Sequence, residues 1–237
     1  MNDTGKIFDE DGEPLAPGAP RPRDAATLIL IRSRRDGHEI LMGQRAKGHV
    51  FMPDKWVFPG GRVDRGDARA PALSELSRTT EDKLRKHAKV RHPRALALAS
   101  VRETFEETGL IVGDRGLATG KPPTGWKDYC AHGAAPRLDR LMFVCRAVTP
   151  PARPRRFDAR FFLAYAEEAL LDDRPITGGA ELLDTRWFSF ADAAGLDLPS
   201  VTRFVIGEIS ARLKAGDLGT APPFLRWTRG KHTLERL

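Results

Sequence analysis

The chain has 237 residues, of which 41% are apolar and 30% charged, a composition typical of a globular protein large enough to bury a core. No run of about 18 apolar residues occurs, so the sequence predicts no membrane span and no membrane partner. Lysine and arginine exceed aspartate and glutamate by 7. This excess favours a small polyanionic substrate over nucleic acid, because no basic motif interleaved with aromatic residues accompanies it. A generally solubilising surface is the alternative.

Residues 1–24 hold four prolines and lack the apolar core of a secretory signal. We therefore expect a loose tail ahead of a single domain spanning 25–237. The two cysteines, Cys130 and Cys145, show neither metal-binding nor redox spacing, which favours a reducing cytoplasm. Cys145 lies within an apolar strand pattern and is expected in the core.

The first predicted elements are strands. Apolar runs at 25–31 and 39–45 flank a polar turn and predict a hairpin. A short strand at 56–58 then enters a turn at Gly60 and Gly61.

A helical region follows this turn. Residues 68–94 contain segments of helical character at 71–76 and 82–87, so we expect one or two short helices there. Pro93 is expected to open the next helix, because the first turn has no intrahelical use for the missing N–H group of a proline. That helix is expected to end at Thr108.

The second half of the chain adds strands around this helix. Residues 113–137 are rich in Gly, Pro and Lys and predict a long loop. The elements expected after it are strands at 140–148, 158–165 and 185–190, a short helix near 190–194 and a helix at 199–214. Strands before and after the central helix predict an α/β sandwich with a mixed sheet, and 216–237 is expected to be a C-terminal extension.

The central helix carries an acidic cluster. Glu103, Glu106 and Glu107 fall within one helical arc of about 100°, on the side opposite the apolar residues. Like charges this close destabilise a helix. A hard divalent cation with oxygen ligands, Mg²⁺ or Mn²⁺, would offset their repulsion. A solvated acidic face is the alternative.

The neighbours of the cluster favour the cation. Arg102 lies four positions before Glu106 and can hold its carboxylate. Gly109 can end the helix in a left-handed conformation. The glycine-rich stretch 56–67 upstream would let backbone carbonyl oxygens approach closely.

Gly61, Asp67 and the run RETFEETGL at 102–110 together resemble the Nudix box. The family pattern is Gly, five residues, Glu, seven residues, Arg-Glu, an aliphatic residue, any residue, Glu-Glu, any residue, Gly and an aliphatic residue. This chain has Asp67 in place of Glu and Thr104 in place of the aliphatic residue. It also has 34 residues (68–101) where seven are usual, an insertion of 27.

An insertion at this place resembles the peroxisomal coenzyme A diphosphatase branch of the family, as do the stretches 50–53, 57–64 and 156–162. The resemblance covers roughly residues 25–215. It implies a Nudix-type α/β/α sandwich with a mixed sheet and a helical insertion at 68–94 within the box.

The resemblance also implies roles for the box residues. Glu103, Glu106 and Glu107 would bind the metal ion together with the carbonyl oxygen of Gly61 or its neighbour Gly60. Arg102 would orient these carboxylates, and Asp67 would be a helper carboxylate outside the ligand shell.

A further carboxylate from a later loop often serves such enzymes as a ligand or base. Glu181 is the candidate, in competition with Asp172, Asp173 and His132. For each of them, an ordinary solvated surface residue is the alternative.

Candidates for binding substrate phosphates are basic residues near the box and on later strands: Arg45, Lys47, Arg62, Arg156 and Arg160. Arg156 and Arg160 would share one face of a strand, where they either bind phosphate or pair with Asp158. Trp126 and Tyr129 would either stack on an adenine or pack locally.

The resemblance implies a metal-dependent hydrolase that splits the diphosphate of a nucleoside diphosphate linked to another group, by attack of water on phosphorus. Coenzyme A or an acyl-coenzyme A is the first expectation, and ADP-ribose or a nucleotide sugar is the alternative. A ligand-binding or regulatory module with weak catalysis is an alternative of another class. The sequence leaves open whether the chain forms a homodimer.

Overall fold

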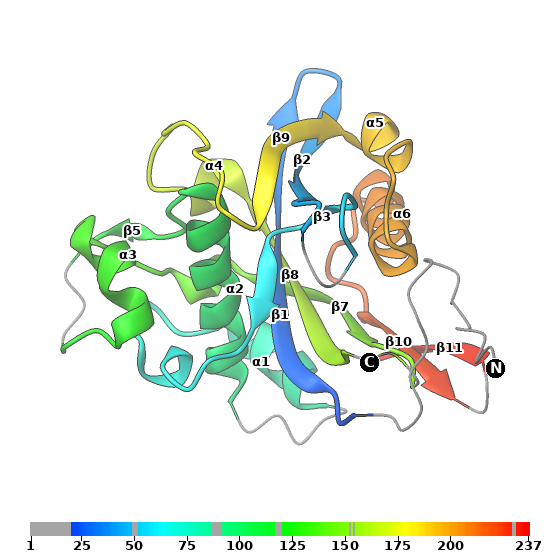
Figure 1. Ribbon diagram of the computed structural model, residues 1–237, viewed down its shortest axis with the longest axis horizontal. Helices are drawn as coiled ribbons and strands as arrows, with labels where there is room; N and C mark the ends of the chain where they lie inside the picture. Colours follow the sequence, from blue (N-terminus) through cyan, green and yellow to red (C-terminus); the bar gives the residue numbers. More distant parts are fainter. Residues whose placement is uncertain are drawn as a thin grey trace, which may run out of the picture.

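A mixed β-sheet crosses the middle of the molecule, with α2 and α6 on opposite sides of it (Figure 1). The computed structural model describes residues 20–48, 52–86, 92–116, 120–151, 153, 155–228 and 231–237. Within them the sheet has nine strands in the order β11-β10-β7-β8-β1-β2-β3, with β4 beside β1 and β9 beside β2. The α/β sandwich predicted from the sequence is confirmed.

The strands of the large sheet are β1 (Arg23–Arg34), β2 (Gly37–Arg45), β3 (Trp56–Val57), β4 (Gly60–Arg62), β7 (Met142–Val148), β8 (Phe157–Tyr165), β9 (Leu182–Ser189), β10 (Pro223–Thr228) and β11 (Lys231–Arg236). A small second sheet pairs β5 (Asp114–Arg115) with β6 (Ala134–Ala135). The α-helices are α1 (Arg78–Arg85), α2 (Pro93–Thr108), α3 (Lys127–Ala131), α4 (Ala166–Ala169), α5 (Phe190–Ala194) and α6 (Ser200–Ala215). The 3-10 turns are η1 (Asp67–Arg69), η2 (Thr124–Trp126) and η3 (Leu138–Arg140).

Strand β1 is central because both of its faces are buried. Leu28 and Leu30 belong to the core that includes α2, whereas Ile29 and Ile31 belong to the core that includes α6. This double burial explains why the strand reads as a continuous apolar run rather than an alternating one. It pairs in parallel with β8 and antiparallel with β2.

Helix α2 lies against β1 with its apolar residues in the core. As predicted, Pro93 opens the helix, and Gly109 ends it in a left-handed conformation with φ 72°. The N–H group of Gly109 donates to the carbonyl oxygen of Phe105 at 2.8 Å. This end fixes where the acidic residues of the last turns lie.

Most predicted elements are confirmed, and two expectations need correction. The segment 71–76 is not helical, because two backbone contacts hold it extended. The Leu73 N–H donates to the carbonyl oxygen of Pro136, and Ser74 forms a parallel β-bridge with Arg137. Residues 113–137 are not an unstructured loop, since they contain α3 and the small sheet. The extension 216–237 contributes β10 and β11 to the large sheet.

Of the expected tail, only residues 20–24 are described, and β1 already begins at Arg23. Cys145 is buried in the core as predicted. Among the described residues, no helix has the length and apolar character that crossing a membrane requires.

Candidate active site

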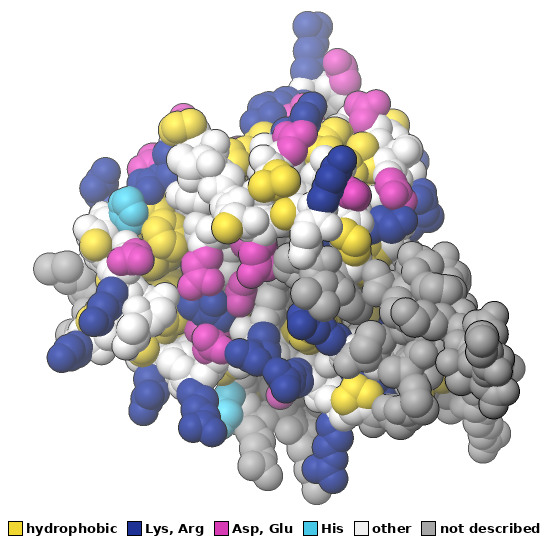
Figure 2. Space-filling view, viewed as in Figure 1, with side chains coloured by type: hydrophobic (Ala, Val, Ile, Leu, Met, Phe, Trp, Pro, Cys, Tyr) yellow, Lys and Arg dark blue, Asp and Glu magenta, His cyan; other side chains and the backbone are white. Residues whose placement is uncertain are grey.

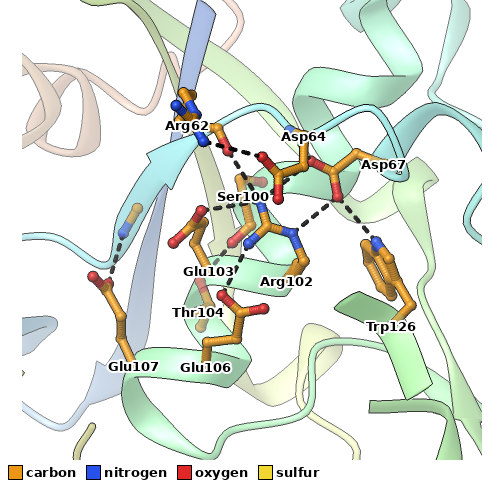
Figure 3. Close-up of polar contacts among 11 residues, drawn as sticks. Arg62, Asp64, Asp67, Ser100, Arg102, Glu103, Thr104, Glu106, Glu107 and Trp126 are labelled. Carbon is orange, nitrogen blue, oxygen red and sulfur yellow. Dashed lines mark hydrogen bonds and ion pairs between the residues drawn. The ribbon is translucent and has the colours of Figure 1, made fainter. Parts of the chain in front are cut away.

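Arg102 on α2 lies at the centre of a buried polar cluster (Figure 3). Its Nε donates to Asp67 Oδ1 at 2.9 Å, and its Nη1 donates to Glu106 Oε2 at 2.9 Å. Its Nη2 donates to the carbonyl oxygen of Arg62 at 3.0 Å and lies 3.0 Å from Glu103 Oε1. The Arg102 side chain is only 6% exposed. Arg102 therefore links the helix to the strand and turn that precede the insertion.

Asp67 anchors this arginine from the other end of the insertion. It is fully buried on η1 and accepts hydrogen bonds from Arg102, from Trp126 Nε1 at 2.9 Å and from the Asp64 N–H at 2.7 Å. The 3-10 turn brings the backbone of residue 67 close enough for the short aspartate side chain to reach Arg102. Asp67 is thus placed to position Arg102.

Glu107 directly contacts β4, the strand that contains Gly60 and Gly61. The Gly60 N–H donates to Glu107 Oε2 at 2.9 Å, and Glu107 is 4% exposed. A Cβ atom on Gly60 would lie 2.7 Å from the carbonyl oxygen of Ala26, and one on Gly61 would lie 2.5 Å from the Glu103 carboxylate. The two glycines therefore let β4 fit between β1 and the acidic helix.

Burial makes the negative charge of the cluster costly. Desolvation raises the pKa of Glu107 to about 8, against the lowering effect of the Gly60 N–H group. Desolvation also raises the pKa of Glu103 to about 7, although the charge of Arg102 opposes the shift. The pKa of Glu106 is raised for the same reason. One arginine is therefore too little to compensate all of these carboxylates.

A divalent cation fits this donor set by its chemistry. The carboxylates supply hard oxygen ligands, and their raised pKa values mark a site where added positive charge is favourable. As the side chains lie, however, no three Asp, Glu, His or Cys residues in the described ranges are arranged to hold an ion. Glu103 and Glu106 contact Arg102 instead.

A cleft of about 760 Å³ extends from the acidic helix. Glu103, Glu181, Gly60 and Gly61 line it together with arginines. Figure 2 shows acidic side chains near the middle of this face and basic side chains just below them. The cleft thus combines carboxylates with cationic side chains.

Three of the four arginines proposed for phosphate binding line this cleft: Arg45, Arg62 and Arg156. Arg160 does not and must be withdrawn from the substrate-binding set. Its side chain is 3% exposed and pairs with Asp24 at 2.8 Å and with Asp158 at 3.1 Å. Of the two roles left open for Arg160, the structure supports the ion pair.

Glu181 lies beside the acidic helix because its loop is fixed at both ends. The Thr177 N–H donates to the carbonyl oxygen of Thr108 at 3.0 Å, and the Ala46 N–H donates to that of Glu181 at 3.1 Å. Gly179 packs on the last turn of α2, where a Cβ atom would lie 2.8 Å from the carbonyl oxygen of Glu106. The charge of Glu181 contributes to the raised pKa values of Glu103 and Glu107.

The competing candidates lie elsewhere. Asp172 pairs with Arg174 at 2.7 Å, and neither Asp172 nor Asp173 lines the cleft. His132 packs against the ring of Phe105, on the side of α2 away from the cleft. Glu181 is the one of these candidates that the fold brings to the acidic cluster.

Of the two roles left open for Trp126 and Tyr129, the structure supports local packing. Trp126 and Tyr129 are buried in the core, with their rings 5.2 Å apart, so neither can stack on an adenine. The Trp126 Nε1–H group instead donates to Asp67. This contact could not be predicted from the sequence, because Trp126 lies in a stretch without hydrophobic periodicity.

The sequence also failed to single out Arg21, Arg23 and Arg155 for the cleft. Arg23 starts β1 two residues before the apolar run begins, so hydrophobic periodicity gave no sign of it. Arg155 belongs to a basic cluster noticeable in the sequence, but only the fold brings it to the cleft.

Known proteins resemble this chain in sequence and in fold. Nudix hydrolase 7 of Caenorhabditis elegans is 29% identical over 164 residues, which cover 65% of this chain and 46% of that protein. The human acyl-coenzyme A diphosphatase NUDT19 is 26% identical over 245 aligned positions, covering 76% of this chain and 64% of that protein. The crystal structure of a Nudix hydrolase from Alicyclobacillus acidocaldarius matches with a TM-score of 0.62 and 29% identity, over 82% of this chain and 96% of that one.

No family model matches the chain. The chain spans about half of one curated relative and almost two thirds of the other. Sequence relatives and solved structure nevertheless agree on one superfamily. The residues that resemble its box are gathered around Arg102.

Proposed function

The chain belongs to the Nudix hydrolase superfamily, and on that premise we propose that it is a metal-dependent hydrolase of a diphosphate linkage, with coenzyme A or an acyl-coenzyme A as substrate. Glu103, Glu106, Glu107 and the Gly61 carbonyl oxygen would hold Mg²⁺ or Mn²⁺. When bound, such an ion neutralises diphosphate charge and lowers the pKa of a bound water.

The protein's own residues would position the reactants. Arg102, held by Asp67, fixes the direction of Glu103 and Glu106. The Gly60 N–H group orients Glu107. Glu181 lies in the cleft beside them and would accept a proton from the attacking water. Because hydrolysis of a diphosphate depends mainly on positioning and electrostatics, this arrangement needs no covalent intermediate.

The observation that favours coenzyme A is the uncompensated positive charge in the cleft. Within the described part of the chain, the side chains of Arg21, Arg23 and Arg155 form no ion pair. In the same described ranges, the guanidinium group of Arg156 donates to the carbonyl oxygens of Thr149 and Pro20 and to no carboxylate. These four arginines carry more positive charge than is needed to neutralise a diphosphate bound at the glutamates.

Coenzyme A supplies the missing charge, because its ribose carries a third phosphate. ADP-ribose carries only the diphosphate and leaves these arginines without a partner. The human relative bears the name acyl-coenzyme A diphosphatase, which supports the same choice.

The test compares coenzyme A, dephospho-coenzyme A and ADP-ribose with Mg²⁺ and with Mn²⁺, identifying the products. We expect kcat/KM for coenzyme A to exceed that for dephospho-coenzyme A by about tenfold or more, since a charged hydrogen bond contributes roughly 1.5–3 kcal/mol. Arg23→Gln should reduce this ratio, whereas Arg35→Gln, in the exposed turn between β1 and β2, should not.

Other results would redirect the proposal. Equal or better hydrolysis of ADP-ribose would favour the alternative substrate class. Tight binding of these diphosphates with no turnover under either metal would favour a regulatory module. A cytoplasmic location stays a prediction.

A further inference from the structure

A second pocket, of about 160 Å³, opens from the cleft between the sheet and the start of α6. The two cavities share part of their walls, including Gly60, Thr27 and Ala159. Gly60 is also the residue whose N–H group holds Glu107. A substrate group in this pocket would therefore be attached close to the diphosphate at the acidic helix.

The pocket walls are mainly apolar. Side chains of Val57, Phe58, Ala147, Phe161 and Val201 line it, drawn from both the sheet and α6. Its polar members are hydroxyl side chains and two arginines, and among the described residues none that lines it is Asp, Glu, Asn or Gln. A sugar would lose water here without the carboxylate and amide partners that satisfy several hydroxyls, whereas an aliphatic group would gain from burial.

Resting on the proposed function, we propose that this pocket binds the branched aliphatic end of the pantetheine arm and selects pantetheine diphosphates over sugar diphosphates. In coenzyme A, the carbon bearing two methyl groups lies next to the diphosphate ester, on the side opposite adenosine. The corresponding group in ADP-ribose is a hydroxylated ribose. The acyl chain of an acyl-coenzyme A is attached at the far end of the pantetheine arm, so it lies beyond this pocket.

Dephospho-coenzyme A and ADP-ribose test this pocket alone, because both contain ADP and differ only in the group on the other side of the diphosphate. Val201→Phe fills the pocket from α6, and Val201→Ala enlarges it. Ala211→Phe adds the same ring at an exposed site on the same helix and is the matched control.

We expect Val201→Phe to lower kcat/KM for dephospho-coenzyme A by about tenfold, since each buried methyl group contributes roughly fourfold. Hydrolysis of ADP-ribose by this variant should stay within about twofold of wild type. Val201→Ala should lower the preference for dephospho-coenzyme A by a few fold through looser contact. Ala211→Phe should change neither rate.

If Val201→Phe lowers kcat/KM equally for both substrates, or lowers it for neither, the pocket assignment is overturned. The proposed function is unaffected by that result. If Val201→Phe fails to fold, as judged by its melting transition, Val201→Ala carries the test. If the wild type hydrolyses neither of these compounds nor coenzyme A, the proposed function fails. The ratio of dissociation constants of the two compounds, measured by calorimetry on the same variants, then decides the pocket.

Discussion

Replacing Glu107 with glutamine should stabilise the metal-free protein while removing its activity. Burial raises the pKa of Glu107 to about 8, from an ordinary value of 4.5. Because the folded state holds this proton more tightly than the unfolded state, the contribution of Glu107 to stability is highest below pH 4.5 and falls as the pH rises toward 8. At pH 7 this difference corresponds to at most about 3 kcal/mol.

Glutamine removes the charge and keeps an oxygen that can accept the hydrogen bond from the Gly60 N–H group. We therefore expect Glu107→Gln to raise the free energy of unfolding by about 1–3 kcal/mol at pH 7 in EDTA. The gain should disappear near pH 4.5. Added Mg²⁺ should stabilise the wild type and leave the variant nearly unchanged, because the variant lacks one proposed ligand.

Urea unfolding measures the difference in free energy of unfolding between Glu107→Gln and the wild type. The measurement is made at pH 7 and at pH 4.5, each with EDTA and with Mg²⁺. A loss of more than about 1 kcal/mol in EDTA at pH 7 would show that the carboxylate is well solvated or well paired. It would refute the view that the cluster holds excess negative charge. Equal stabilisation of both proteins by Mg²⁺ would exclude Glu107 as a ligand.

Three further substitutions test other parts of the site. Asp67→Asn should destabilise the protein by about 3 kcal/mol in urea unfolding, because it leaves the buried Arg102 without its most deeply buried carboxylate partner. A change below about 1 kcal/mol would contradict this. Gly60→Ala should lower the free energy of unfolding by about 1–3 kcal/mol, because the added Cβ atom would collide with β1. Gly207→Ala on α6, where a Cβ atom meets nothing within 4 Å, is the control and should be neutral or stabilising in the same assay. Glu181→Gln should lower kcat by about 100-fold or more with little change in stability, and an unchanged rate would remove Glu181 from the site.

The sequence predicted the parts of the site that depend on local periodicity. Glu103, Glu106 and Arg102 lie within two turns of one helix, so their spacing alone placed them together. Pro93 and Gly109 marked its ends by their backbone preferences.

What could not be predicted depends on contacts between distant segments. Trp126 reaches Asp67 across 59 residues, and no periodic pattern surrounds it. Residues 71–76 have helical composition, yet pairing with Pro136 and Arg137 keeps them extended. Arg160 and Arg23 show the same limit, because strand periodicity assigns a face but not which face is open to the cleft.

The hydrogen bonds between Asp67 and Arg102 join the two ends of the segment that interrupts the box. Since these bonds hold the two ends together, the arrangement of the residues around Arg102 does not depend on the length of the segment between them. The segment also supplies Leu84 to the core, so shortening it would lower thermal tolerance before it altered chemistry. A change in the length of this segment is therefore expected to alter the thermal stability of the protein more than its rate of catalysis.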